Sequence, residues 1–291
     1  MRVLVAMPHF FGEAAGDKTN QSRQPAKRAE RIRALINSIA GFHQIFGDQV
    51  YGLDHGKREV QQSAAIASLD LVVCTAGASH LLDELKPISS LYRNHVASVD
   101  PIMLGFECHR LMRQAQGQYD YYCYVEDDII IKDPLFFRKL ELFDSEFGHD
   151  ALLQPNRYEI RLSGPIHKLY VDYGLRPAVT ALYQSVSGAA LELAFAGHTV
   201  RFERTTYPSA GSFFLNAAQL AHWVASPYFL DGDISYMSSL DSAATLSIMK
   251  TFQVYKPVID QAWFLEVEHA SPRWIGGIEN QVRFVRHKDN A

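Results

Sequence analysis

Stretches rich in apolar residues alternate with stretches of helical periodicity through the first half of this chain. The first, Val3–Met7, is a continuous apolar run, and Leu69–Cys74 and Tyr121–Ile131 are two further candidates for buried strands. A run without polar alternation is typical of a strand that is covered on both faces, as in a parallel sheet. Three stretches are expected to be helical: from Pro25 to about Gly47, from about Pro101 to Gln116, and Pro134–Phe147. This order predicts right-handed βαβ units, and therefore an α/β fold with a mostly parallel central sheet flanked by helices.

The second half of the chain is less regular. Short aromatic and β-branched stretches indicate strands at Tyr158–Leu162, Leu169–Tyr173, Val200–Thr206 and Phe252–Pro257, and apolar periodicity indicates helices at Asn216–Ala225 and Ser239–Thr251. No repeat, low-complexity tract or Pro/Gly/Ser-rich linker divides the 291 residues. We therefore expect one domain over residues 1–291, in which about 1–131 and about 132–291 form two fused halves.

Charge and composition exclude several functional classes. Because 28 Lys and Arg stand against 32 Asp and Glu, the formal net charge is −4, and a nucleic-acid partner is not expected. The cysteines Cys74, Cys108 and Cys123 have no CxxC spacing, which argues against a structural zinc site and a disulfide framework. No apolar run reaches the roughly 20 residues that span a bilayer. We expect a cytoplasmic protein, for which peripheral contact with the inner membrane face stays open.

Three consecutive acids, Glu126, Asp127 and Asp128, follow the apolar residues Tyr124 and Val125 and precede more apolar residues. Buried, unpaired carboxylates cost several kcal/mol each, and a divalent cation is the natural compensation. The carboxyl ends of strands are where open α/β sheets bind ligands, and oxygen ligands suit Mg²⁺ or Mn²⁺. If the strand continues through the acids, Glu126 and Asp128 lie on one side of it and Asp127 on the other. The alternative is an acidic turn that caps the next helix.

The segment Tyr124–Leu140, YVEDDIIIKDPLFFRKL, resembles the metal-binding DXD region of nucleotide-sugar-dependent glycosyltransferases with the GT-A fold, in the EDD form of N-acetylglucosaminyltransferases. The resemblance implies a Rossmann-like donor half fused to an acceptor half, a UDP-sugar donor, and a carbohydrate, lipid-linked or other acceptor. It implies that Asp128 binds Mn²⁺ or Mg²⁺, while Glu126 and Asp127 contact the ribose, the donor sugar or metal-bound water. By the same resemblance, Pro8, His9 and Phe10 lie where such enzymes hold the nucleobase.

Glycosyl transfer places negative charge on the departing diphosphate, so cationic groups are needed there. The stretch Val254–His269 resembles the late strand and turn that return a histidine to the metal, and His269 is the expected second ligand. The alternative is a structural histidine, and His287 is the competing phosphate contact. Arg28 and Arg31 lie three residues apart on the first expected helix and would share a face near the donor phosphates, unless that face is simply solvated.

An inverting transferase also needs a carboxylate that deprotonates the acceptor hydroxyl. Asp241 opens an apolar helix, where many inverting GT-A enzymes place this base. The alternative is that Asp241 only caps the helix, and Asp231 and Asp233 are competing bases. A retaining enzyme would need no such base.

Two other functional classes stay open. A metal-dependent phosphoesterase would use the same three acids with His269, and a non-catalytic carbohydrate-binding protein would bind sugar without a metal. Aromatic surfaces for an acceptor are expected among Trp223, Tyr228, Phe229, Trp263 and Trp274, and the alternative is that these residues belong to the core. Residues 12–19 approach a phosphate-binding P-loop, but Asp17 occupies its second glycine position, which disfavours an NTPase.

Overall fold

A five-stranded sheet forms the centre of the computed structural model, which describes residues 1–12, 24–63, 68–175 and 177–277. Its strands are, in spatial order, β13 (Ser212–Asn216), β6 (Tyr121–Val125), β1 (Arg2–His9), β4 (Ser68–Ala76) and β5 (Arg93–Ala97). The last four run parallel to their neighbours, and only β13 is antiparallel. The predicted α/β class with a mostly parallel central sheet is confirmed.

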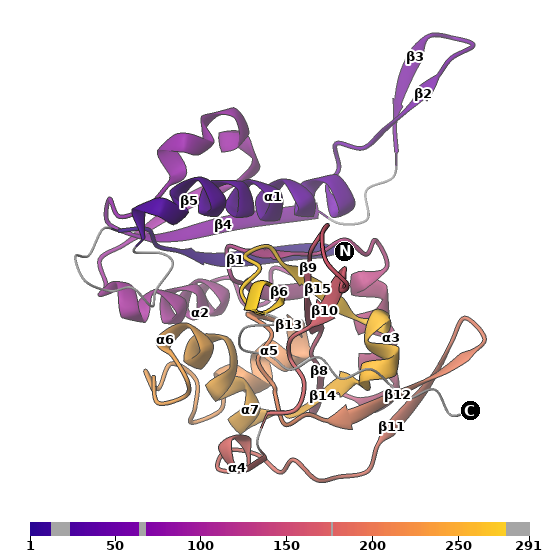
Figure 1. Cartoon of the computed structure of the whole chain (residues 1–291). Coiled ribbons are helices and arrows are strands. Elements are labelled where there is room, and N and C mark those ends of the chain that lie inside the picture. The colour runs from indigo at the N-terminus through magenta and orange to yellow at the C-terminus, as the bar shows by residue number, and fades with distance from the viewer. Residues whose placement is uncertain (13–23, 64–67, 176, 278–291) are drawn as a thin grey trace.

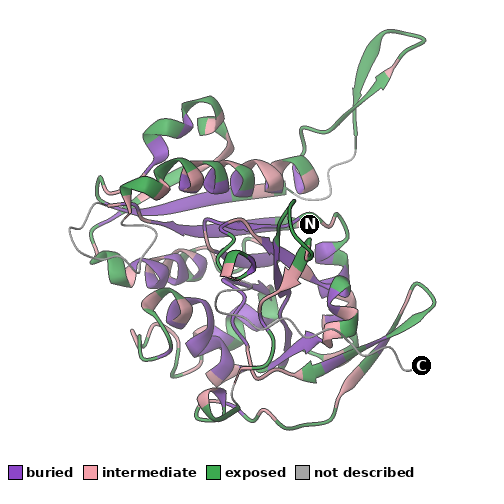
Figure 2. Ribbon diagram, in the orientation of Figure 1, coloured by how far each residue is buried: buried purple, intermediate pink, exposed green. Residues whose placement is uncertain are grey.

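Helices α1 (Arg28–Phe46) and α2 (Leu104–Gln114) cover the two faces of this sheet, as Figure 1 shows. The reason is the strand period of two. One core contains Val3, Val5 and Met7 of β1 with Leu35, Ile39 and Phe42 of α1, and the other contains Leu4 and Ala6 of β1 with Leu104, Cys108 and Met112 of α2. Strand β1 is therefore buried on both sides, as its unbroken apolar run predicts (Figure 2).

The second half of the chain builds two smaller sheets beside the first. One has the order β10 (Lys168–Tyr170), β9 (Asn156–Ile160), β15 (Glu266–His269) and β7 (Ile129–Ile130). The other has the order β11 (Leu191–Phe195), β12 (His198–Arg204), β14 (Gln253–Pro257) and β8 (Ala151–Leu153). Strand β13 belongs to the second half of the chain yet pairs with β6, so the central sheet contains strands from both expected halves.

The predicted strand Tyr121–Ile131 is wrong in one respect that matters for the site. Strand β6 ends at Val125, and β7 begins at Ile129 in a different sheet. The acids Glu126–Asp128 therefore lie in a turn between two sheets. The expectation that strand alternation separates Asp127 from Glu126 and Asp128 does not apply.

The remaining α-helices are α3 (Phe136–Phe147), α4 (Pro177–Thr180), α5 (Ala217–Val224), α6 (Ser239–Asp241) and α7 (Ser247–Thr251). All except α4 fall within stretches that the sequence predicts to be helical. The structure also has 3₁₀ helices at Pro25–Lys27, Leu82–Leu91, Pro101–Met103, Ile259–Phe264 and Ile275–Gly277. The predicted helix Ser239–Thr251 is interrupted by a π-helical turn, Ser242–Leu246. Here α2 approaches closely: a Cβ added to Gly105 would lie 2.4 Å from the Cβ of Ala243.

A two-stranded hairpin, β2 (Tyr51–Asp54) with β3 (Glu59–Gln62), extends away from the rest of the molecule (Figure 1). Sequence analysis did not predict it, because its strands are short and almost wholly exposed. Among the described residues, no helix combines the length and the apolar character needed to cross a bilayer.

Candidate active site

A cavity of about 840 Å³ opens at the carboxyl ends of β1 and β6. Because these strands are parallel neighbours, the residues that follow each of them meet at one edge of the sheet. Pro8 and Phe10 line the cavity from β1, and Glu126, Asp127 and Asp128 line it from the turn after β6. The opposite wall comes from the second half of the chain, in particular Arg157, Tyr207, Met237–Asp241, His269, Arg273 and Trp274.

Backbone hydrogen bonds hold the acidic turn in place. The N–H of Glu126 donates to the carbonyl of Gly211 (2.8 Å), and the carbonyl of Asp128 accepts from the N–H of Ala270 (2.8 Å). Gly211 has φ +60°, and a Cβ there would lie 3.0 Å from Oε2 of Glu126. A glycine is therefore required at this position for both its conformation and its space.

Arg31, from the buried face of α1, bridges two of the acids. Its guanidinium donates to Asp127, and also to Oδ2 of Asp128 at 2.7 Å. Although burial disfavours the cation, Asp127 and Asp128 raise the pKa of Arg31 above its ordinary value. Burial alone would raise the pKa of Asp128, but His269 and Arg31 together hold it far below the ordinary carboxyl value.

His9 supports Asp127 from inside the protein rather than from the cavity wall. The N–H of Leu81 donates to His9 Nε2 (3.0 Å), so Nε2 carries no proton and Nδ1 donates to Oδ2 of Asp127 (2.5 Å). His9 is only 1% exposed and does not line the cavity. The expectation that His9 contacts a nucleobase is therefore not supported by its position, whereas Pro8 and Phe10 do face the cavity.

His269 is brought to Asp128, as the sequence predicts, by the pairing of β15 with β7. Its Nε2 lies 3.5 Å from Oδ2 of Asp128, and its Nδ1 lies 3.0 Å from Oε1 of Glu159. Burial opposes the imidazolium, but Asp128 and Glu159 raise the pKa of His269 to about 9. Glu159 is fully buried and also accepts the backbone N–H groups of Arg273, Trp274 and Ile275. Sequence analysis missed Glu159, since an acid within a short strand carries no signal of burial.

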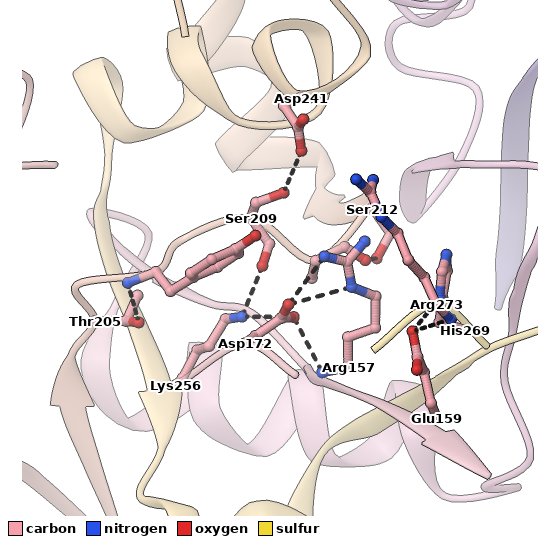
Figure 3. Close-up of polar contacts among 12 residues, drawn as sticks. Arg157, Glu159, Asp172, Thr205, Ser209, Ser212, Asp241, Lys256, His269 and Arg273 are labelled. Carbon is pink, nitrogen blue, oxygen red and sulfur yellow. Dashed lines mark hydrogen bonds and ion pairs between the residues drawn. The ribbon is translucent and has the colours of Figure 1, made fainter. Parts of the chain in front are cut away.

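A second polar network lies under the cavity wall that the second half of the chain forms (Figure 3). Both Nε and a terminal nitrogen of Arg157 donate to Oδ1 of the fully buried Asp172, at 3.2 and 3.0 Å. Lys256 donates to Oδ2 of Asp172 (3.1 Å) and to the carbonyl of Ser209 (2.8 Å). Burial lowers the pKa of Lys256 to about 8 despite the neighbouring carboxylate. The network fixes Arg157 as a buried cation at the cavity wall.

Asp241 reaches the cavity with both carboxylate oxygens already oriented. Ser209 Oγ donates to its Oδ1 (3.2 Å) and Ser238 Oγ donates to its Oδ2 (2.6 Å). The N-cap of α6 is Ser238, whose Oγ accepts the N–H of Asp241. Across the cavity, burial and the charges of Asp241 and Asp128 raise the pKa of Glu126 to about 8. The carboxyl groups of Glu126 and Asp241 therefore face one space.

Three other predicted residues do not line the cavity. Asp233 and Asp231 pair with Lys250, at 2.7 and 3.6 Å. Arg28 is exposed and pairs with Glu84 (2.8 Å). The expectations of a base at Asp233 and a phosphate contact at Arg28 are therefore not supported, because these side chains are directed to other partners. His287 and the P-loop-like residues 13–19 lie outside the described residues.

Of the aromatic residues considered, only Trp274 lines the cavity, where it is 43% exposed. The guanidinium of Arg273 lies 5.4 Å from the centre of its ring. Trp223 is fully buried in the core, and Trp263 is exposed elsewhere. Trp274 is therefore the one predicted aromatic surface that a ligand in this cavity would meet.

No protein-family model matches this chain, and no curated protein is significantly similar to it. Solved structures of S. aureus TarS are distantly similar. TarS 1-349 is 10% identical with a TM-score of 0.43, covering 88% of this chain and 58% of that one. The complex of TarS 1-349 with UDP is 10% identical with a TM-score of 0.42, covering 88% of this chain and 57% of that one. The complex with UDP-GlcNAc is 11% identical with a TM-score of 0.39, covering 94% of this chain and 61% of that one. The chain thus covers less than two thirds of each of these structures, and TM-scores this low assign neither family nor function.

Proposed function

We propose that this protein is a metal-dependent glycosyltransferase that moves a sugar from a nucleoside diphosphate sugar, with UDP-sugar as the favoured donor, to a hydroxyl group of an acceptor. The observation that carries the proposal is the convergence of Asp128, His269, Glu126 and Asp241 on one cavity at the carboxyl edge of a parallel sheet. Such edges are where open α/β sheets bind their ligands.

The residues around Asp128 fit a divalent cation. Its Oδ1 is buried and has no hydrogen-bond partner among the described residues, while Arg31 occupies Oδ2. The hydrogen bond from His269 Nδ1 to Glu159 leaves Nε2 as the ligand atom, the arrangement in which a carboxylate orients a metal-binding histidine. Asp128 Oδ1 and His269 Nε2 would therefore hold Mn²⁺ or Mg²⁺, leaving other positions for phosphate and water. When bound, the cation would neutralise charge that develops on the departing diphosphate.

The other residues take roles that their positions favour. Pro8, Phe10 and Asp127, on the β1 and β6 side, would bind the nucleoside, and Arg31 would keep the two aspartates correctly oriented. Asp241, as a carboxylate held by two serine hydroxyls, would accept the proton of the acceptor hydroxyl. Trp274 would stack on a sugar ring. Donor and acceptor would thus enter from opposite walls of the cavity.

Calorimetric titration of UDP and of GDP in Mn²⁺, and then in EDTA, tests the proposal. We expect binding of UDP that requires Mn²⁺ and is lost in D128N, a variant that keeps the shape of the side chain. D83N, in an exposed carboxylate away from the cavity, is the matched control and should bind as the wild type does. Metal-independent binding, or binding of neither nucleotide, would overturn the proposal and favour a carbohydrate-binding protein or a phosphoesterase.

A further inference from the structure

His149, Asp150 and His222 form a second group of metal-type side chains, and none of them lines the cavity. His149 and Asp150 lie between α3 and β8, whereas His222 lies on α5. One donor atom from each lies within 4.8 Å of the other two, and no other such group of three occurs within the described parts of the chain. Two segments that are far apart in sequence thus bring two imidazoles and a carboxylate together.

Buried and partly buried hydrogen bonds connect the elements that carry these side chains. Asn216 caps α5 in a capping box with Gln219. The side chain of Asn216 donates to Asp144 of α3 (2.9 Å), and that of Gln219 donates both to Asp144 and to the carbonyl of Ala151 at the start of β8 (each 3.3 Å). Helix α5 is therefore fixed to the end of α3 and to β8, the two elements that flank His149 and Asp150.

Contacts with neighbouring residues also orient the three candidate ligands. The ring of His222 packs against Phe252 (5.5 Å between centroids) and edge-on against His149 (5.7 Å). Asp150 is tied to β14, because its carbonyl accepts the N–H of Gln253 (2.9 Å). His149 Nε2 lies 3.4 Å from Oδ1 of Asp150.

Two imidazoles and one carboxylate favour Zn²⁺ over the cations proposed for the cavity. Imidazole nitrogens suit zinc, whereas Mg²⁺ prefers oxygen ligands. Donors that bind zinc tetrahedrally at about 2.1 Å lie about 3.4 Å apart. The side chains of His149 and Asp150 are 57% and 72% exposed, so rotation about their side-chain bonds can close the remaining gap. Three protein ligands leave the fourth position for water.

We propose that His149, Asp150 and His222 bind one Zn²⁺ ion at a site separate from the cavity and independent of the proposed transfer reaction. The ion would join the α3–β8 connection to α5. Because the unfolded chain does not hold these three side chains together, zinc would stabilise the folded protein.

The test is calorimetric titration of ZnCl₂ into the full chain, cleared of metals with EDTA and kept in excess Mg²⁺. We expect one zinc per chain in the wild type. H149A and H222A should each weaken binding at least about tenfold, since the loss of even an outer-shell partner costs about that much. H55A, which removes an exposed histidine from the β2–β3 hairpin, is the matched control and should bind as the wild type does.

Thermal unfolding gives a second measurement. Zinc should raise the Tm of the wild type and of D128N, but not that of H149A, whose exposed side chain can be removed without disturbing the core. Unchanged zinc binding in H149A and H222A would overturn the proposal, as would loss of the zinc site in D128N. Retention of the zinc site in a chain that binds no nucleotide would leave it standing while the proposed transferase function fails.

Discussion

Oε1 of Glu159 and Nδ1 of His269 lie 3.0 Å apart, although 110 positions separate them in the chain. Their contact follows from strand register. Strands β9 and β15 are parallel, and Tyr158 pairs with Glu268, so the next residue of each strand lies beside the other. The pair gives the imidazole a fixed orientation toward Asp128.

The Glu159–His269 pair predicts an effect on metal affinity that a purely structural pair would not have. In E159Q the imidazole loses its charged partner, and we expect Mn²⁺ to bind about 10–100-fold more weakly in calorimetry. The control is E266Q, in strand β15, which also contains His269. It loses an ion pair with Lys168 instead and should bind Mn²⁺ as the wild type does. A lower Tm in E159Q with unchanged Mn²⁺ affinity would show that Glu159 only holds the fold.

Arg31 and Arg28 are one helical turn apart on α1. Because their surroundings differ, we expect their replacement to lower the free energy of unfolding by very different amounts. R31M leaves Asp127 and Asp128 buried without their common cation, which should lower the free energy of unfolding by about 3–5 kcal/mol. R28M removes an exposed pair with Glu84 and should cost no more than about 1 kcal/mol. Urea unfolding of the two variants at neutral pH measures both values. Equal, small losses would mean that Arg31 does not stabilise the acidic turn.

Asp241 is predicted to act on the reaction rather than on the helix. In D241N we expect UDP binding in Mn²⁺ to persist while sugar transfer falls by about 10²–10⁴-fold, the usual contribution of a general base. S238A is the matched control, since it removes the N-cap of α6 and one hydrogen bond to Asp241 but keeps the carboxylate. If S238A and D241N lose the same stability and D241N transfers sugar normally, Asp241 is part of the cap alone.

The raised pKa of Asp144 predicts that the stability of the folded protein depends on pH. Burial raises the pKa of Asp144 from 3.8 to about 6, against the lowering effect of hydrogen bonds from Asn216, Tyr121 and Gln219. Because the folded state holds this proton more tightly than the unfolded state, protonation of Asp144 stabilises the folded protein. This contribution to the free energy of unfolding is fully present below about pH 4 and is lost as the pH rises through 6. It is at most about 3 kcal/mol.

The measurement is the difference in unfolding free energy between D144N and the wild type from pH 4 to 7. This difference should move in favour of D144N as the pH rises, because only the wild type has the titrating group. D48N, in an exposed loop, removes a charge without this environment and serves as the control. A difference that does not change with pH would contradict the prediction.

The elements were predictable wherever a local pattern carries the information. The unbroken apolar run of β1, the largely apolar run of β4 and the periodicity of α1, α2 and α3 correspond to elements of the structure. Burial on two faces or on one stripe leaves a direct mark on residue order. The β2–β3 hairpin, β5 and β11 were missed, since largely exposed strands need no such pattern. The buried strands β8 and β13 were missed as well, because three consecutive apolar residues are too few to distinguish a strand from other buried segments. The break between β6 and β7 was missed because apolar residues continue on both sides of the acids.

The sequence by itself determined the α/β class and indicated Asp128, His269 and Asp241 as residues to bring together. Only the tertiary structure decided that Arg31 bridges Asp127 and Asp128, that His9 lies behind the site, and that Asp233 and Arg28 have other partners. It also added Glu159 and Arg157, whose importance comes from burial and from contacts across more than a hundred positions in the case of Glu159. Local residue order sets strand and helix, whereas the partner of a charged side chain depends on strand register and on the way sheets pack.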